Sequence, residues 1–358
     1  MTKIAFNQEQ QLDLTRRLQL MLLEAVMASG TWVQDDIRFQ GGTCLSLVHG
    51  SSRFSEDLDF VIGTDRGLAR VLSAAEVRMG ERLRLALPGA QVKFSARDDD
   101  IESLDAKNPR TFMMTVSHPD WHRAVKVKVE FWVANPEAVA KYEARTLPAR
   151  LLTQVVEGVP LRVTLAPVLV RSAETQEILV DKLHALACRS YMKHRDVYDL
   201  WWLSQSGQQL DWCAELKRRY DYHAEMYNDS PTLPALGQAL AAKADEIAAM
   251  AGDATFSQDL KKWLGAKDSL ATQASADVIA TQVAQQLREL ALQLSAERSD
   301  DHQALASPSL GGGLMTAPAA PPAKESFLAK WTRVINDANP PGVPLIDPRD
   351  KPSRRKPS

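Results

Sequence analysis

The sequence predicts an α+β protein in three parts, with a strand-containing domain, a helical domain and a low-complexity tail. Period-two alternation of apolar and polar residues is confined to the first 167 residues. Apolar residues then recur at helical spacing up to about residue 298, and a stretch rich in Gly, Pro and Ser follows. We therefore expect domains at 1–167 and 168–298, and a flexible tail at 299–358.

Composition indicates a folded protein in a reducing compartment. A chain of 358 residues that is 45% hydrophobic can bury a core, and its net charge is −2. Binding to nucleic acid would therefore depend on a local basic face. The sequence has no signal-peptide pattern and no apolar run of the roughly 18 residues that span a bilayer, so we expect a cytoplasmic protein without a membrane partner. No CxxC pair or Cys–His cluster is formed by the three cysteines, Cys44, Cys188 and Cys213.

The first domain is expected to begin with a helix at 6–29, closed by Gly30. A second helix is expected at 68–85, where Pro88 and Gly89 end it. Period-two patterns and flanking turn residues predict the strands between and after these helices. They lie at 35–39, 57–63, 91–96, 111–116, 125–133, 151–156 and 161–165.

Helices are expected from Ser172 onward. Ser172 is the predicted N-cap of a helix that runs to Tyr191, because Glu174 and Glu177 suit the early turns of a helix. Further helices are expected at 193–203, 210–222, 233–250 and 278–294. In the tail, apolar residues between Phe327 and Ile335 predict a short amphipathic helix that docks on this chain or a partner, before a basic end at 354–356.

Acidic residues on two predicted strands suggest a metal site. Asp57 and Asp59 are two residues apart, so both side chains project from one face of a strand. Their oxygens suit Mg²⁺. In the strand at 125–133, alternation directs Lys126, Lys128 and Glu130 away from the core. Two plainer interpretations stay open, an exposed turn for the paired acids and an ordinary half-solvated strand for Glu130.

A glycine turn precedes the acidic pair. Gly41, Gly42 and Thr43 follow an apolar strand and precede the helical segment 44–48, so backbone N–H groups at the helix start would face a triphosphate. The turn is not a P-loop, because no Gly-Lys-Ser/Thr follows it, and it is not a GxGxxG fingerprint.

Charged residues recur at helical spacing on two later predicted helices. Lys182 and Arg189 are seven residues apart and share a helix face. Arg195, Asp196 and Asp199 lie within one turn of the next helix. The spacing of Lys182 and Arg189 would also fit a solvated basic stripe. The spacing on the next helix would also fit a surface ion pair worth about 0.3–0.5 kcal/mol.

Four segments together resemble the AbiEii/AbiGii (MenT-like) nucleotidyltransferase toxins, a branch of the DNA polymerase β-like superfamily. The segment GGTCLSLVHGSSRFSEDLDF, residues 41–60, resembles their first motif, and Lys-Val-Glu-Phe at 128–131 resembles the second. The segment KLHALACR, residues 182–189, resembles their third motif, and RDVYDL, residues 195–200, resembles the fourth. Gln40 departs from the pattern, since relatives commonly carry Lys before the two glycines.

The resemblance implies a mixed-sheet nucleotidyltransferase core and a role for each candidate residue. Asp57, Asp59 and Glu130 would hold Mg²⁺ or Mn²⁺, and Glu130 would alternatively accept the proton of the attacking hydroxyl. The catalytic candidates are Asp57, Asp59, Glu130, Lys182 and Asp199. The nucleotide-binding candidates are Gly41, Gly42, Thr43, Lys182, Arg189 and Asp196.

The function implied by the resemblance is that of a toxin from a type IV toxin-antitoxin or abortive-infection system. Such a toxin would transfer NMP from an NTP to an RNA acceptor, with the tRNA 3′ end as the leading candidate, and block translation. Its partners would be an NTP, the RNA and a cognate antitoxin, for which a winged-helix protein is the candidate. Two alternatives stay open: a transferase that modifies a protein or small-molecule hydroxyl, and a non-catalytic nucleotide-binding module.

Overall fold

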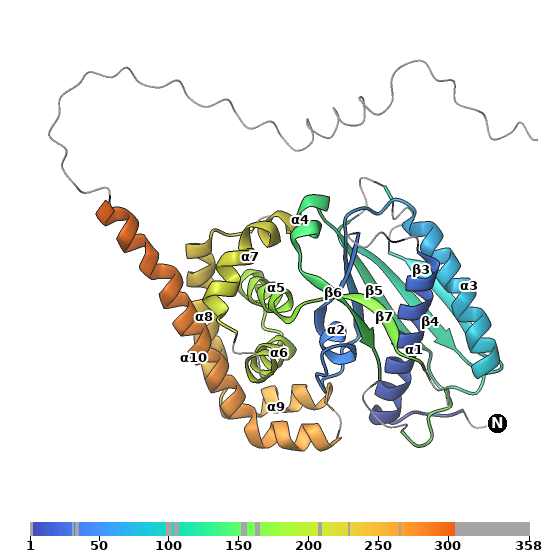
Figure 1. Cartoon of the computed structure of the whole chain (residues 1–358). Coiled ribbons are helices and arrows are strands. Elements are labelled where there is room, and N and C mark those ends of the chain that lie inside the picture. Colours follow the sequence, from blue (N-terminus) through green and yellow to red (C-terminus); the bar gives the residue numbers. More distant parts are fainter. Residues whose placement is uncertain are drawn as a thin grey trace, which may run out of the picture. The chain divides into compact units, whose positions relative to one another are not determined.

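The computed structural model describes ten segments of one unit that spans residues 1–305, and Figure 1 shows a sheet beside a group of helices. The expected tail helix at 327–335, the basic end at 354–356 and most of the strand candidates at 151–156 and 161–165 lie outside these segments. The described residues are 3–30, 32, 36–97, 102–103, 107–151, 156–161, 165–206, 210–227, 230–264 and 266–304.

A seven-stranded mixed sheet forms the first half of the unit, in the order β3-β4-β5-β2-β1-β7-β6. β2 pairs in parallel with β5, and β1 pairs in parallel with β7, while the other neighbours are antiparallel. The expected mixed-sheet core is therefore confirmed. The strands are β1 Ile37–Gln40, β2 Asp57–Ile62, β3 Gln91–Ala96, β4 Arg110–Ser117, β5 Val125–Val133, β6 Ala144–Ala149 and β7 Val168–Ala173.

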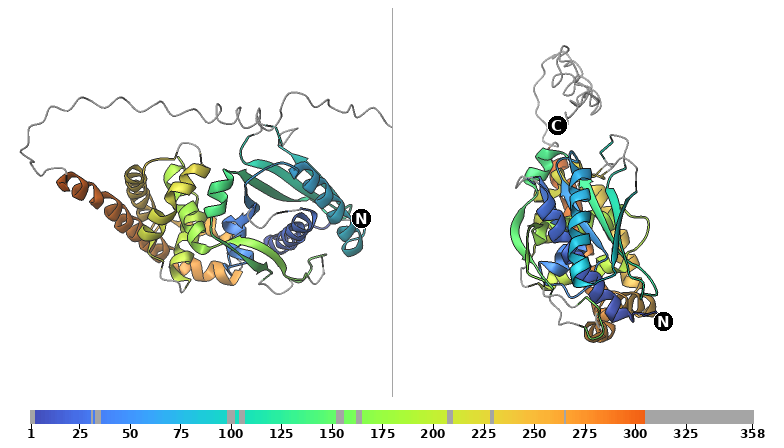
Figure 2. Two further views of the ribbon diagram at one scale, coloured as in Figure 1. Left: turned by 45° about the horizontal axis from the view of Figure 1, so that its top comes forward. Right: turned by 90° about the vertical axis from the view of Figure 1, so that its right-hand side faces the viewer.

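Helices α1 (Gln8–Ser29) and α3 (Leu68–Ala86) lie side by side against the sheet (Figures 1 and 2). α1 begins with a capping box between Asn7 and Gln10, which satisfies two backbone N–H groups of its first turn. In the core, the rings of Phe60 on β2 and Phe131 on β5 stack with centroids 4.9 Å apart. This contact helps to hold together the two strands that carry the candidate acids.

The remaining helices form a group at the other end of the unit, as Figure 1 and the left view of Figure 2 show. α5 packs against α6, α7 and α8, and α10 packs against α8 and α9. The short helices α2 (Gly41–Leu47) and α4 (Pro136–Lys141) lie beside the sheet. The helices of the group are α5 Thr175–Cys188, α6 His194–Gln205, α7 Trp212–Met226, α8 Leu233–Ala249, α9 Ala254–Lys261 and α10 Ala266–Ala304.

The prediction for residues 168–173 was wrong. Ser172 does not cap a helix but lies in β7, opposite Phe39 of β1, and Glu174 is the residue before α5. Val168 and Val170 are buried and alternate with more exposed residues, as in a half-buried strand. The sheet therefore continues past the expected boundary at residue 167. The division of the chain into three domains stays a prediction.

Four other features differ from expectation, and the first is that α4 was not predicted. β6 was not predicted, because Pro148 lies within it, and the strand tolerates Pro at the edge of the sheet. α9 was also not predicted. α10 continues to Ala304, so the first six residues of the expected linker, 299–304, are helical.

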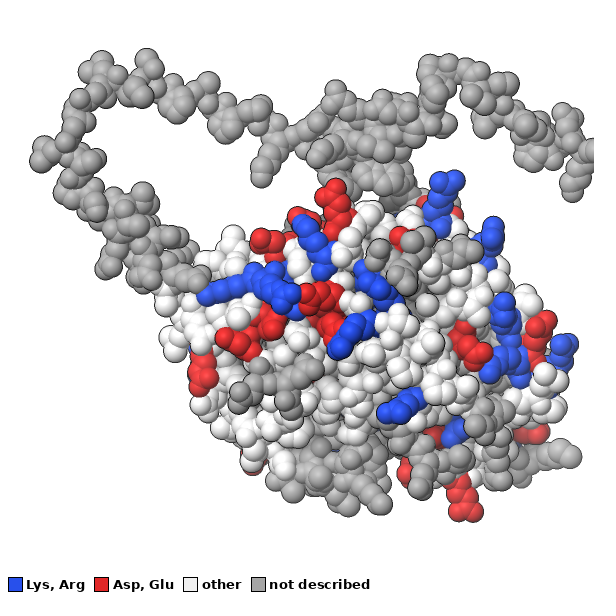
Figure 3. Space-filling view, viewed as in Figure 1, with Lys and Arg blue, Asp and Glu red and all other residues white. Residues whose placement is uncertain are grey.

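The surface seen in Figure 3 carries interspersed Lys, Arg, Asp and Glu side chains rather than a large patch of one sign. This mixture agrees with the net charge of −2. Among the described residues, no helix combines the length and apolar character that crossing a bilayer requires.

Candidate active site

Three carboxylates meet on the neighbouring parallel strands β2 and β5. In the register of this pair, Asp59 lies opposite Glu130, and Asp57 lies opposite Lys128. One oxygen from each of Asp57, Asp59 and Glu130 lies within 4.8 Å of the other two. Parallel pairing in this register puts the odd-numbered side chains of β2 and the even-numbered side chains of β5 on one face. The three acids predicted from separate strands are thus brought together.

The three acids repel one another. Burial, together with the charges of Asp57 and Glu130, raises the pKa of Asp59 to about 7. The ammonium of Lys128 offsets part of this repulsion, since its Nζ lies 2.9 Å from Asp57 Oδ2 and 3.2 Å from Glu130 Oε1. One lysine against three carboxylates leaves a negative surplus. These hard oxygen donors fit a divalent cation such as Mg²⁺.

The glycine turn is pressed against the acids. Gly41 has φ +76°, and a Cβ built on it would lie 2.5 Å from Asp59 Oδ2. A Cβ on Gly42 would lie 2.2 Å from a guanidinium nitrogen of Arg53. Thr43 is buried, and its hydroxyl donates a hydrogen bond to the Asp57 carbonyl. The Thr43 side chain therefore ties the turn to β2 instead of reaching toward a ligand.

Charged groups on α5 and α6 converge opposite the acids. Lys182 Nζ lies 2.6 Å from Asp196 Oδ1 and 2.8 Å from Asp199 Oδ2, and Arg189 binds the other oxygen of Asp196. Burial lowers the pKa of Lys182, but the charges of the two aspartates outweigh it, so the net pKa is raised. The pKa of Asp196 is lowered, because Lys182 and Arg189 outweigh its burial. Lys182 is consequently a partly buried lysine that stays charged, with its side chain 14% exposed.

Arg53 is a part of the site that sequence reasoning missed. Its Nε and Nη2 donate to the two carboxylate oxygens of Asp199 at 2.6 and 2.8 Å, and both side chains are at most 1% exposed. The pair joins the loop before β2 to α6. Arg53 does occur in the first motif, between Gly50 and Asp57, but nothing in its local spacing identifies a partner 146 residues away.

A cavity of about 340 Å³ separates the acids from the lysine and is lined by both groups. Of the residues expected in the site, Thr43 and Asp199 do not line this cavity. Asp199 is fully buried behind Lys182. The expected residues that line it are Gly41, Gly42, Asp57, Asp59, Glu130, Lys182, Arg189 and Asp196.

A buried hydrogen-bond network supports the cavity from the side of α5 and α7. His223 lies between Glu177 and Asp181, with Nε2 2.6 Å from Glu177 Oε2 and Nδ1 2.9 Å from Asp181 Oδ1. Burial lowers the pKa of His223, but the charge of Asp181 and the two hydrogen bonds outweigh it and raise the pKa to about 9. The hydroxyl of Tyr142 lies 2.6 Å from Asp181 Oδ2 and 2.9 Å from Gln40 Oε1. Gln40 is thereby fixed at the cavity wall.

The whole sheet and the site lie within one family match. The family described as "Nucleotidyl transferase AbiEii toxin, Type IV TA system" matches residues 33–280. The chain belongs to the AbiEii family. As an AbiEii toxin, it is a nucleotidyltransferase with an NTP as its substrate and an antitoxin as its partner. The family resemblance inferred from the sequence is confirmed.

Several solved structures are similar to this AbiEii toxin at low identity. A putative nucleotidyltransferase from H. pylori is 18% identical, with a TM-score of 0.36 and coverage of 78% of this chain and 94% of that chain. JHP933 from Helicobacter pylori is 18% identical, with a TM-score of 0.33 and coverage of 79% and 93%. MenT4, a nucleotidyltransferase toxin from Mycobacterium tuberculosis H37Rv, is 18% identical, with a TM-score of 0.46 and coverage of 84% and 94%. No curated protein matches the chain.

Proposed function

We propose that this AbiEii toxin transfers a nucleoside monophosphate from an NTP to the 3′ end of an RNA, with tRNA as the leading acceptor, and thereby blocks translation. The observation that carries the proposal is a 340 Å³ cavity with three converging carboxylates on one side and the charged lysine Lys182 on the other. The toxin would act in the cytoplasm, and a winged-helix protein is the candidate antitoxin.

Asp57, Asp59 and Glu130 are the proposed ligands of Mg²⁺ or Mn²⁺. Their mutual repulsion and their hard oxygen donors support this role. A divalent cation bound there would neutralise charge on the transferred phosphate and on the leaving pyrophosphate. Lys128 bridges Asp57 and Glu130 and would shift toward the phosphates when a cation takes its place.

In the proposed reaction, the 3′-hydroxyl oxygen of the RNA forms a bond to the α-phosphorus of the NTP. The bond from that phosphorus to the oxygen bridging to the β-phosphate breaks, and pyrophosphate leaves with the bonding electrons. The hydroxyl proton passes to a carboxylate, for which Glu130 is the candidate. The protein supplies position and electrostatic stabilisation.

Lys182 and Arg189 are proposed to bind the triphosphate. Both line the cavity opposite the acids, and Asp196 contacts both side chains and so fixes their direction. Asp199 is proposed as a positioning residue, because it contacts Lys182 from behind and does not line the cavity. Gly41 and Gly42 would let the backbone approach the phosphates closely.

The test is to incubate the purified 358-residue chain with each of four NTPs labelled at the α-phosphate, total tRNA and Mg²⁺. We expect label in the RNA, and no label with Asp57→Asn, which keeps the shape of the side chain but removes its charge. Label on protein instead of RNA would support a protein-modifying transferase. If neither gains label, the proposed reaction is wrong. Toxicity that persists in Asp57→Asn would favour a non-catalytic module.

A further inference from the structure

A second and larger cavity, of about 840 Å³, adjoins the proposed nucleotide cavity. It is bounded by the start of α1, the loop before β2, strands β4 and β5, α6 and the segment after α9. Asp57, Lys128 and Arg195 line both cavities. A ligand in the larger cavity would therefore reach the acidic cluster from the side away from Lys182. We call it the outer cavity.

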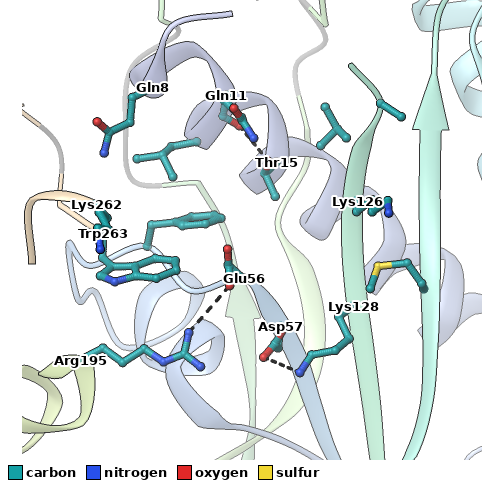
Figure 4. A pocket seen from close by; sticks show the side chains of 15 residues that line it. Gln8, Gln11, Thr15, Glu56, Asp57, Lys126, Lys128, Arg195, Lys262 and Trp263 are labelled. Carbon is teal, nitrogen blue, oxygen red and sulfur yellow. Dashed lines mark hydrogen bonds and ion pairs between the residues drawn. The ribbon is translucent and has the colours of Figure 1, made fainter. Parts of the chain in front are cut away.

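The charge of the outer cavity is predominantly positive. Its lining contains four basic residues and two acidic ones, Glu56 and Asp57. Three of the basic residues form ion pairs: Lys128 with Asp57, Arg195 with Glu56 and Lys262 with Asp259. In Figure 4, Lys262 and Arg195 lie on one side, Lys126 and Lys128 lie on the other, and Asp57 lies between them. Lys126 is exposed and forms no ion pair with any residue that the structure describes. A free cation of this kind suits a phosphate.

One wall of the outer cavity combines aromatic rings with a guanidinium group. The rings of Phe54 and Trp263 are stacked, with centroids 6.3 Å apart and planes inclined by 14°. The guanidinium carbon of Arg195 lies 5.4 Å from the ring centroid of Trp263. A backbone hydrogen bond of 2.6 Å from Phe54 N to Trp263 O holds this wall together. Aromatic rings and Arg guanidinium planes are the groups on which unpaired bases stack.

β5 leads from the outer cavity into the nucleotide cavity. Lys126, Lys128 and Glu130 occupy alternate positions on one face of this strand, and Glu130 is the member within the acidic cluster. Lys126 lines only the outer cavity, whereas Lys128 lines both. A backbone whose phosphates follow these lysines would present its terminal hydroxyl to the acids.

We propose that the outer cavity binds the last nucleotides of a single-stranded RNA 3′ end. The proposal deepens the proposed function and rests on it. The phosphates contact Lys126 and Lys262, which also pairs with Asp259. The bases lie against Arg195 and Trp263, and the buried Phe54 supports the Trp263 ring from behind. The two substrates then meet at Asp57 from opposite sides, with the NTP held by Lys182. The unpaired Lys126 beside a wall of indole and guanidinium groups favours this polyanion over a protein acceptor.

Lys126→Glu is the variant that tests the outer cavity, because Lys126 is exposed and its replacement breaks no ion pair of the described structure. The matched control is Lys141→Glu, the same charge reversal at an exposed residue that lines neither cavity. The RNA probe for direct binding is a fluorescent single-stranded oligonucleotide with a free 3′-hydroxyl. We expect Lys126→Glu to weaken RNA binding and to raise the KM for RNA by about tenfold or more. The KM for NTP should stay within twofold of the wild-type value.

Salt dependence gives a second readout. Removal of one phosphate contact in Lys126→Ala should reduce the slope of log Kd against log salt concentration by about 0.7. In addition, an RNA with 4-thiouridine at its 3′ end should cross-link to the peptide that contains Trp263 or Arg195. Cross-links confined to other peptides would overturn the proposal.

The outcomes test RNA binding in the outer cavity separately from the proposed nucleotidyl transfer. If the wild type labels RNA but Lys126→Glu matches it in KM and Kd, the outer cavity is not the acceptor site, and the proposed reaction stands. If the wild type labels no RNA, the proposed reaction is wrong. The binding and cross-linking results then decide by themselves whether the outer cavity binds RNA. Labelled protein without RNA binding rejects both proposals.

Discussion

Arg53 and Asp199 form a bidentate ion pair in the interior of the protein, with N–O distances of 2.6 and 2.8 Å. It joins the loop that leads into the acidic strand β2 to α6, and Asp199 also contacts Lys182. The pair therefore connects the negative and positive sides of the nucleotide cavity.

Loss of this buried pair should be strongly destabilising. Arg53→Ala leaves the Asp199 carboxylate with one cation fewer in the interior, and we expect it to lower the free energy of unfolding by about 3–5 kcal/mol. Urea denaturation measures the change. The control is Arg288→Ala, because Arg288 forms an ion pair with Asp245 in which both side chains are about half exposed or more, and this change should cost no more than about 1 kcal/mol. Equal effects of the two substitutions would contradict the prediction.

Gly41→Ala should abolish nucleotidyl transfer. The added Cβ would lie 2.5 Å from Asp59 Oδ2, so the carboxylate must move out of the acidic cluster. Gly67→Ala is a matched control, because Gly67 has φ +83° and a Cβ there meets nothing within 4 Å. Both variants should lose about 1–2 kcal/mol of stability from the left-handed backbone. The labelled-NTP assay should show a large loss only for Gly41→Ala, and an active Gly41→Ala protein would disprove the steric argument.

Stability should fall as the pH rises from about 6.5 to 9. The pKa of His223 is raised to about 9 in the folded protein, from an ordinary value of 6.5. The folded state therefore holds the proton more tightly, and the resulting stability is complete below pH 6.5 and is lost as the pH rises through 9, with a slope of at most about 1.4 kcal/mol per pH unit. Free energies of unfolding between pH 6 and 9.5 test this for the wild type and for His223→Gln, which cannot titrate. Parallel pH profiles of the two proteins would contradict it.

Mg²⁺ should stabilise the protein even without NTP. A cation that binds only the folded state raises its stability by RT ln(1 + [L]/Kd), and here it would also relieve the repulsion among Asp57, Asp59 and Glu130. We expect Mg²⁺ to raise the Tm of chelator-treated wild type. Asp59→Asn should lose most of the shift, because it removes one ligand charge. An equal shift in both proteins would place the cation elsewhere.

Lys182→Ala should lower nucleotidyl transfer by about 10²–10³-fold if Lys182 stabilises the charge of the triphosphate. Both aspartates that it contacts keep another cation, since Arg53 remains on Asp199 and Arg189 remains on Asp196. The variant should therefore fold, which circular dichroism can verify. Lys182→Arg should recover part of the lost activity. Full activity in Lys182→Ala would remove Lys182 from the proposed mechanism.

Much of the site could be predicted from the sequence because its signals are local. The two-residue spacing of Asp57 and Asp59 and the alternation around Glu130 determine the face of the strand on which each acid lies. The register that sets Asp59 beside Glu130 could not be predicted from the pattern, because it joins strands about 70 residues apart in sequence. The pairing of β7 with β1 also joins distant segments and could not be predicted from the pattern. Ser172 was consequently predicted to be a helix cap.

One residue, Glu174, separates the end of β7 from the start of α5. β7 and the acidic strand β2 are the two neighbours of β1. The helix that bears Lys182 is thus joined by a single residue to the same sheet that bears the three carboxylates. So short a connection restricts changes in the distance between these opposite charges. We therefore expect an incoming nucleotide to be accommodated by rotation of side chains instead of by the opening of two lobes.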